Sequence, residues 1–318
     1  MPFVPQTQPW PADSALLLVH GVGSYVRKDY DTVLGALERA LGPAIWSRLA
    51  VYTVLYDEVN DWFAEKTQAA AMLQTLVGGL QARFPNTNLG QIAAEAVGDV
   101  VWPILSRNAR AALREAILVQ LRQVVLDGDA KGVLRRQQKL HVLGHSLGCF
   151  HAYEALWAAA TDGMHGLQPV NHGVRFASVV MIASPVQLIR TVAGDLQALV
   201  PAAASLATLG QPLGVPAQRQ PGFDTPSVRR FVSLTGDLDP VGGHLFHQRL
   251  PWAYMDLAGA ESVIEPQNVA GGNTEPAVAD ALERARAAPL GISLTPDNPH
   301  DWVAYVDRNA NRIANWLA

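Results

Sequence analysis

Short apolar runs alternate along the chain with longer stretches in which apolar positions recur at helical spacing. Several of these runs are apolar throughout, a pattern typical of strands that are buried on both faces of a parallel sheet. Six runs predict strands, at Ala15–His20, Leu49–Tyr56, Leu140–Gly144, Phe176–Ala183, Arg230–Thr235 and Trp252–Leu257. The alternation predicts an α/β fold with a mostly parallel central sheet that is flanked by helices.

Seven stretches predict helices, at Asp29–Leu41, Ala64–Ala82, Gln91–Ser106, Arg107–Leu126, Cys149–Ala160, Pro276–Ala287 and Asp301–Leu317. The fourth has one apolar stripe, which we expect to pack in the core and which consists of Leu113, Ile117, Leu121, Val124 and Val125. Arginines lie largely off this stripe, at positions Arg110, Arg114 and Arg122. We therefore expect a solvated helix face at Arg107, Arg110 and Arg114.

Two segments are too long to be simple connections between elements, and insertions of that size usually shape or cover a site. Residues 57–138 predict a helical insertion, and residues 185–229 predict a cap or lid. We expect both to belong to a single domain, residues 1–318. Within the second segment, Leu196–Gln218 carries no charge and is long enough to cross a bilayer of about 30 Å. Its three prolines make a poor spanning helix, so we expect an apolar lid and no membrane span.

Composition narrows the classes of function. The chain has 24 Lys and Arg against 28 Asp and Glu, so it lacks the basic excess that binding to nucleic acid requires. The single cysteine, Cys149, excludes an internal disulfide and any multi-cysteine metal site. Met1–Pro11 has no basic residue and no apolar run, unlike a signal peptide, which makes the cytoplasm the expected location.

The strongest chemical signal is the sequence KLHVLGHSLGCF, in which an apolar run ends in Gly144-His145-Ser146-Leu147-Gly148 and a helical pattern follows at once. A G-x-S-x-G motif between a strand and a helix is typical of a nucleophile elbow, in which the serine occupies a strained turn. The glycines avoid side chains that would collide with neighbouring backbone. Ser146 is therefore the candidate nucleophile, and the alternative is an ordinary glycine-rich turn.

A second signal is the sequence LLLVHGVG, an apolar run that ends in His20-Gly21-Val22-Gly23. Acyl transfer places negative charge on a carbonyl oxygen, which backbone N–H groups must stabilise. One such donor is the residue after the nucleophile, here Leu147, and the other lies in a loop after an early strand. Val22 is the candidate for this second donor of the oxyanion hole.

With these two motifs and this order of strands and helices, the chain resembles the α/β-hydrolase superfamily, in particular its serine lipases and esterases. The resemblance extends from about Ala15 to the C-terminus. It implies an α/β-hydrolase fold and a triad in the order Ser, acid, His, with the acid after a later strand and the His after the last one. The motifs are specific for the superfamily and only weakly specific for the substrate.

The implied order leaves three of the nine histidines as candidates for the base: His244, His247 and His300. His300 follows the last predicted strand and opens the closing helix, where the superfamily has its base; a purely structural helix-entry residue is the alternative. His244 and His247 come only a few residues after the expected acid, so we expect them to line the substrate pocket or its rim, with His20 and His145 as further substrate-binding candidates.

The acid is expected in FVSLTGDLDPV, a predicted strand followed by a turn with Asp237 and Asp239. Either carboxylate could orient His300 and stabilise its imidazolium form. The Asp-Pro-Val sequence of Asp239 is similar to the acid loop of lipases, which favours Asp239, and turn capping is the alternative for the other aspartate.

Other chemistries have weaker support. His141 and His145 are four residues apart on a strand and its turn, so they do not form the helical HExxH zinc site. A GxGxxG nucleotide motif is absent. We expect Cys149 to be a small buried packing residue and Asp301 to be a helix-entry carboxylate. No metal or cofactor is expected.

The sequence therefore predicts a serine hydrolase that cleaves carboxylic esters, as an esterase or a lipase, through a Ser-His-Asp triad and an acyl-enzyme. The expected partner is a small ester or a lipid. Two roles are open for the apolar lid: contact with an acyl chain or a lipid surface, or packing on its own domain alone. The same residues fit an acyltransferase, a thioesterase or a phospholipase, and a ligand-binding module without turnover is the alternative from another class. The oligomeric state and the physiological ester are left open.

Overall fold

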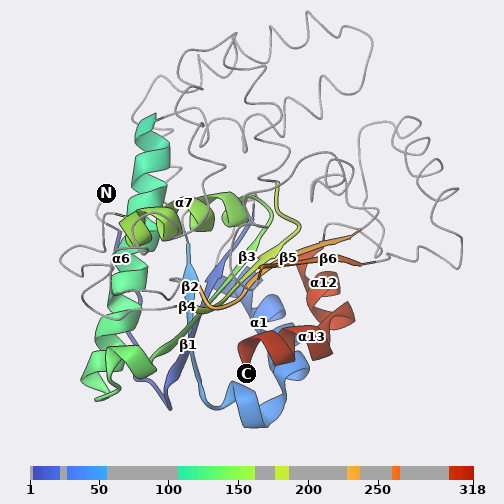
Figure 1. The fold of residues 1–318 in the computed structure, drawn as a ribbon, viewed down its shortest axis with the longest axis horizontal. Coiled ribbons are helices and arrows are strands. Elements are labelled where there is room, and N and C mark those ends of the chain that lie inside the picture. Colours follow the sequence, from blue (N-terminus) through green and yellow to red (C-terminus); the bar gives the residue numbers. More distant parts are fainter. Residues whose placement is uncertain are drawn as a thin grey trace, which may run out of the picture.

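The structure, a computed structural model, describes residues 3–21, 27–55, 107–161, 176–185, 228–236, 260–265 and 301–318. These residues form a six-stranded sheet in the order β2-β1-β3-β4-β5-β6, and each pair of neighbouring strands is parallel (Figure 1). Helices pack on both faces of the sheet. The predicted α/β class is thereby confirmed for this part of the chain.

The strands are β1 (Ser14–Val19), β2 (Leu49–Val54), β3 (Lys139–His145), β4 (Phe176–Ile182), β5 (Phe231–Gly236) and β6 (Ala260–Glu265). The first five agree with the predicted strands to within about two residues at each end. The sixth predicted strand, Trp252–Leu257, lies outside the described residues. The sequence did not predict β6, because AESVIE has only two large apolar residues and places a glutamate near each end.

The order of the strands creates a switch point between β1 and β3. The chain leaves β1 through α1 (Arg27–Trp46) towards β2, whereas it leaves β3 through α7 (Leu147–Thr161) towards β4 on the opposite side. Right-handed crossovers in opposite directions require helices on opposite faces of the sheet, which is where α1 and α7 lie (Figure 1). Open α/β sheets bind ligands at the carboxyl ends of the strands beside such a switch point.

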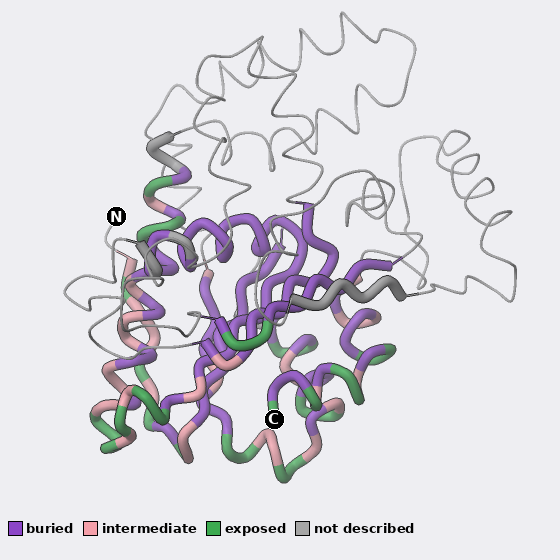
Figure 2. The backbone as a smooth tube through the Cα atoms, viewed as in Figure 1, coloured by how far each residue is buried: buried purple, intermediate pink, exposed green. Residues whose placement is uncertain are grey.

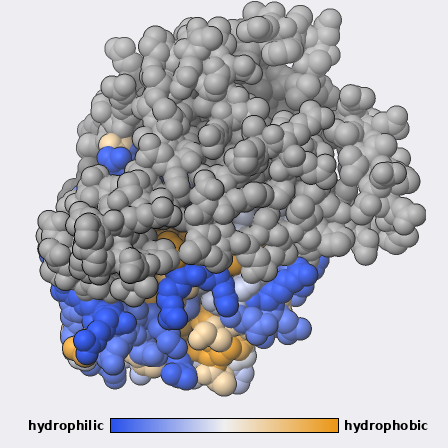
Figure 3. All heavy atoms as spheres, in the orientation of Figure 1, coloured by the Kyte–Doolittle hydropathy of each residue, from blue (hydrophilic) through white to orange (hydrophobic). Residues whose placement is uncertain are grey.

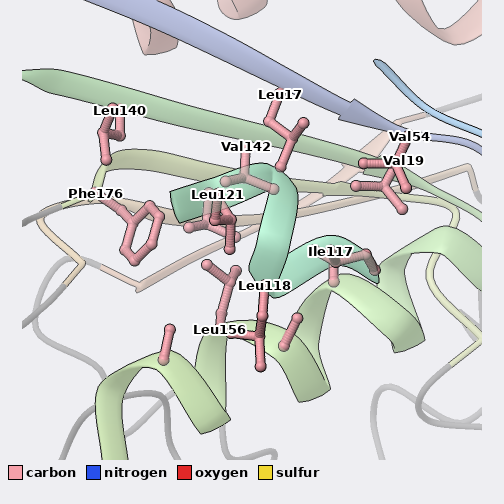
Figure 4. Packing of buried hydrophobic residues seen from close by; sticks show 14 of the residues in the cluster. Leu17, Val19, Val54, Ile117, Leu118, Leu121, Leu140, Val142, Leu156 and Phe176 are labelled. Carbon is pink, nitrogen blue, oxygen red and sulfur yellow. The ribbon is translucent and has the colours of Figure 1, made fainter. Parts of the chain in front are cut away.

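One face of the sheet is covered by α6 (Arg107–Ala130) and α7. Figure 4 shows the contact, in which Leu17 and Val142 of the sheet point towards Leu121 of α6 and Leu156 of α7. Every predicted stripe residue of α6 is buried, from Leu113 to Val125. Burying one such side chain stabilises the fold by about 1.5–3 kcal/mol, so this stripe anchors α6 firmly.

Three helices cover the other face: α1, α12 (Trp302–Arg308) and α13 (Ala310–Leu317). The sequence predicted one closing helix, Asp301–Leu317, but Asn309 interrupts it with a non-helical backbone, and its side-chain amide donates a hydrogen bond to the Tyr305 carbonyl. The first helix is longer than predicted and kinks at Gly42, where φ is 69°. The predicted helices Ala64–Ala82, Gln91–Ser106 and Pro276–Ala287 lie outside the described residues, as do nearly all of the lid at 185–229 and residues 57–106 of the insertion predicted at 57–138. The described remainder of that insertion, residues 107–138, contains the helix α6.

The expected arginine face of α6 is wrong at Arg110, which is buried and forms an ion pair with Glu154 of α7 (Nε to Oε2, 2.6 Å). Arg110 precedes Leu113 by three residues and Ile117 by seven, so it continues the apolar stripe of α6 towards its N-terminus. Arg114, which follows Leu113 by one residue and so lies off the apolar stripe, is exposed as predicted.

Burial follows this layered arrangement. The described side chains of α7 are buried, as are most of those in β1 to β5, whereas α1, α6 and α13 turn exposed positions outwards (Figure 2). The described surface visible in Figure 3 is mostly hydrophilic. Among the residues that the structure describes, no helix combines the length and apolarity that a membrane span needs.

Candidate active site

Ser146 lies between the end of β3 and the start of α7, at the carboxyl edge of the sheet. Its φ is 51°, a left-handed conformation that costs a residue other than glycine on the order of 1–3 kcal/mol. Two hydrogen bonds hold the bend: Ser146 N donates to the Ile182 carbonyl (3.0 Å), and Cys149 N donates to the Ser146 carbonyl (3.0 Å). The strained turn expected around this serine is therefore present, tied to β4 on one side and to the first turn of α7 on the other.

Two glycines allow this turn to pack closely. A Cβ on Gly148 would lie 2.0 Å from the carbonyl oxygen of His20 and 2.4 Å from that of Val19. A Cβ on Gly144 would lie 3.1 Å from the Cα of Cys149. Backbone thus meets backbone where α7 begins, as the sequence predicted for both glycines, and α7 is held against the end of β1.

The turn after β1 passes beside the serine. A Cβ on Gly21 would lie 2.7 Å from the Ser146 Cβ and 3.3 Å from the His145 carbonyl oxygen. Val22, the candidate oxyanion donor, lies outside the described residues. Leu147 is the first residue of α7, and N–H groups in the first turn of a helix have no partner within the helix. Its N–H is thus next to Ser146 in the chain and has no partner within α7, while its role as an oxyanion donor stays a prediction.

His20 and His145 are buried within an aromatic cluster. The His145 ring stacks on Trp302, with ring centroids 5.2 Å apart and an interplanar angle of 9°. The His20 ring meets Tyr30 edge-on, and Tyr30 in turn meets Trp302 edge-on. The predicted substrate-binding role of the two histidines stays a prediction, and the structure assigns them a packing role beneath the serine turn.

The remaining candidates for the triad and the pocket lie outside the described residues. Asp237 and Asp239 come just after Gly236, the last residue of β5, and they lie outside the described residues, as do His244, His247 and His300. Asp301 is described, and its carboxylate caps α12 by accepting a hydrogen bond from Ala304 N (3.1 Å). The expected role of Asp301 at the entry of the closing helix is thereby confirmed.

Ionisable side chains are buried on the face of α7 that packs against α6. Glu154, paired with Arg110, has a raised pKa because burial outweighs the opposing effect of that arginine. His151, also on α7, has its pKa lowered to about 3, mainly by burial and further by His20 and Arg110. A histidine with this pKa is a poor proton acceptor at neutral pH, so His151 is unsuited to be the base.

The sequence signals missed three features of the described structure. Ala183, the residue after β4, has a φ of 52° and donates its N–H to the Leu234 carbonyl (2.8 Å), so two neighbouring strands end in left-handed residues other than glycine. The second feature is the Arg110–Glu154 pair, for which the lone glutamate in the apolar α7 was a signal. The third is the aromatic set Tyr30, Trp302 and Tyr305, whose spacing gave no sign of a shared site.

Cys149 is buried and its thiol donates to the Ile182 carbonyl (3.3 Å), as expected of a small packing residue. Among the described residues, no group of three His, Cys, Asp or Glu side chains is arranged to hold a metal ion.

No protein-family model matches the chain, and no curated protein matches it either. The local geometry around Ser146 therefore carries the functional interpretation.

Proposed function

We propose that this chain is a serine hydrolase of the α/β-hydrolase superfamily that cleaves carboxylic esters. The observation that carries the proposal is the left-handed Ser146, with φ of 51°, in the turn from β3 to α7. Strained residues persist only where the surrounding structure holds them, and they cluster at active sites. A turn of this kind presents the hydroxyl of a nucleophile at the edge of the sheet.

The position of Ser146 in the fold supports this reading. It follows β3, and Gly21 follows β1, so both lie at the switch point where open α/β sheets bind their ligands. A ligand-binding module has no need of a strained serine against a glycine turn and the start of a helix. A nucleophile needs both neighbours, because they supply the backbone N–H groups that stabilise an oxyanion.

In the proposed reaction, the Ser146 oxygen attacks the acyl carbon of the ester while His300 accepts the hydroxyl proton. The Leu147 and Val22 N–H groups donate hydrogen bonds to the oxyanion. Collapse of this intermediate breaks the bond to the alcohol, which leaves with the proton from His300, and the acyl group remains on Ser146. Water then attacks the acyl-enzyme, again with His300 as base, and releases the acid. Asp239 orients His300 and stabilises its charged form.

The substrate class follows from the charge-poor segment Leu196–Gln218. Its Leu, Val and Ala side chains suit an acyl chain better than a polar group. A preference for longer acyl chains with activation at a lipid surface identifies a lipase, and a maximum at short chains without activation identifies an esterase.

The test combines labelling by a fluorophosphonate with hydrolysis of p-nitrophenyl esters of increasing chain length. We expect label on Ser146 in the folded protein and turnover that Ser146→Ala and His300→Ala reduce by on the order of 10⁶. Asp239→Asn is expected to lower kcat by about 10⁴, with Asp237→Asn as its matched control. Absence of labelling in folded protein contradicts the proposal, and a larger loss in Asp237→Asn reassigns the acid.

A further inference from the structure

Helix α12 contacts the ends of two strands that are far apart in the sequence. Trp302, in its first turn, stacks on His145 at the end of β3. Tyr305, one turn later, accepts a hydrogen bond through its hydroxyl from Gly236 N at the end of β5 (2.6 Å). Both aromatic side chains are buried. One short helix therefore connects the strand that leads to Ser146 with the strand that leads to Asp237 and Asp239.

The same cluster reaches the end of β1. The Tyr30 ring meets Trp302 edge-on, with centroids 6.1 Å apart. The Tyr30 hydroxyl accepts a hydrogen bond from His20 N (3.2 Å) and donates one to the Val54 carbonyl (3.0 Å). His20 is followed by Gly21, which lies against Ser146. Trp302 thus contacts the residue before Ser146 directly and is linked to the end of β1 through Tyr30.

Trp302 also limits where the preceding chain can lie. Asp301 caps α12, and residue 300 is bonded directly to Asp301. Two residues of chain span at most about 7 Å, so the start of α12 determines how far residue 300 can lie from Trp302. The stack of Trp302 on His145 therefore limits how far the proposed base can lie from the serine turn, and the hydrogen bond from Gly236 N to the Tyr305 hydroxyl ties the end of β5 to the same helix.

We propose that Trp302 and Tyr305 are positioning residues, which hold α12 so that the base at its start lies between the nucleophile and the acid. This inference rests on the proposed function. Misplacing a reacting group by about 1 Å can reduce the rate by on the order of 10²-fold. Neither side chain needs to touch the substrate for this effect.

The first arm of the test compares two tryptophans on the same face of the sheet. Trp302→Phe and Trp302→Leu are compared with Trp316→Phe, which changes a buried tryptophan of α13. Turnover is expressed per Ser146 that a fluorophosphonate titrates, so that unfolded protein does not count. We expect kcat to fall about 10-fold in Trp302→Phe and about 10²-fold in Trp302→Leu, with KM within about threefold of wild type. Trp316→Phe is expected to keep the wild-type kcat. The phenylalanine variant decides the question if the leucine variant fails to fold.

The second arm uses Tyr305→Phe, with Tyr52→Phe as the control. Tyr52 also has a buried side chain, and its hydroxyl donates to Asp127 (2.8 Å) at the β2 edge of the sheet. A carboxylate near a histidine raises its pKa, and the reaction needs the neutral base. Displacing the acid strand in Tyr305→Phe should therefore lower the apparent pKa of the acid limb in the kcat/KM profile, and it should lower kcat. A purely structural role would lower thermal stability without moving this limb.

The outcomes separate this inference from the proposed function. If wild-type protein turns over esters through Ser146 but Trp302→Phe matches Trp316→Phe and Tyr305→Phe keeps the wild-type pH profile, the positioning role is overturned and the proposed function stands. If Ser146→Ala retains full turnover or Ser146 is not labelled, the proposed function fails and the positioning role fails with it.

Discussion

The close approach of α7 to β1 yields a sharp prediction at Gly148. A Cβ at this position would lie 2.0 Å from the His20 carbonyl oxygen and 2.4 Å from the Val19 carbonyl oxygen. Contacts of a real Cβ below 3.0 Å are essentially never seen, so Gly148→Ala must move the start of α7 or the end of β1 by about 1 Å. Both sides of the contact are backbone, and neither can rotate away as a side chain could.

The expected loss of stability follows from this overlap. Overpacking in a tight core costs about 1–3 kcal/mol and occasionally more, and we expect the upper end of that range for Gly148→Ala. The matched control is Gly35→Ala in α1, where the nearest atom to a Cβ is the Arg39 guanidinium at 3.7 Å. Alanine in a helix interior is more favourable than glycine by about 0.5–1 kcal/mol, so Gly35→Ala should be stabilising. The same chemical change is thus expected to have opposite signs, with a difference of about 3–4 kcal/mol.

A third variant separates collision from backbone strain. Gly42 has a φ of 69° and nothing within 4 Å of a Cβ, so Gly42→Ala measures strain alone, at about 1–3 kcal/mol. The assay is equilibrium unfolding in urea, followed by tryptophan fluorescence and far-UV circular dichroism. A free energy of unfolding for Gly148→Ala within about 1 kcal/mol of Gly35→Ala would refute the close packing at the serine turn.

Two further predictions concern regions away from the serine. Burial, aided by Lys139, lowers the pKa of His141 to about 4, so between this value and the unfolded pKa of 6.5 only the unfolded chain takes up the proton. The free energy of unfolding is therefore expected to fall by about 2 kcal/mol between pH 8 and pH 5. In urea unfolding, His141→Gln should lack this part of the pH dependence. An unchanged slope would contradict the assigned cause. At the β2 edge, the Gln6 side chain donates to Thr53 Oγ1 (2.9 Å) and accepts from Thr53 N (2.9 Å), and the Gln8 amide donates to the Val51 carbonyl. These bonds occupy backbone groups that an open strand edge would offer to another chain. The double variant Gln6→Ala, Gln8→Ala should therefore self-associate more than wild type in sedimentation velocity. An association state equal to wild type at all concentrations would argue against this protective role of the two glutamines.

The sheet could be predicted because strands buried on both faces are apolar throughout. Leu16, Leu18, Val142 and Val180 are all buried, and their runs located the strands of the sheet centre. The serine turn could be predicted equally well, because the need for a glycine before and after the turn is local to the backbone. The prediction of an exposed arginine face was wrong at Arg110, because this residue has an ion-pair partner on α7. The prediction of a single closing helix was wrong at Asn309, whose side chain bonds the Tyr305 carbonyl where α12 ends.

The aromatic contacts could not be predicted from local patterns. Trp302 stacks on His145 and Tyr305 bonds Gly236 only because α12 packs across the strand ends, and neither pair is close in the sequence. In the sequence, Trp302 and Tyr305 are ordinary apolar positions of an amphipathic helix. The physical information that gives them a further role is the tertiary contact itself.

The central claim is that a hydroxyl on a strained turn is activated by an imidazole and a carboxylate from distant parts of the chain. The most direct measurement is an experimental structure of the protein after reaction with a fluorophosphonate. We expect phosphorus bonded to Ser146 Oγ, a phosphoryl oxygen that accepts a hydrogen bond from Leu147 N, and the His300 ring within hydrogen-bonding distance of the adduct. An adduct on another residue, or a His300 ring directed away from the modified serine, would rule out the proposed mechanism.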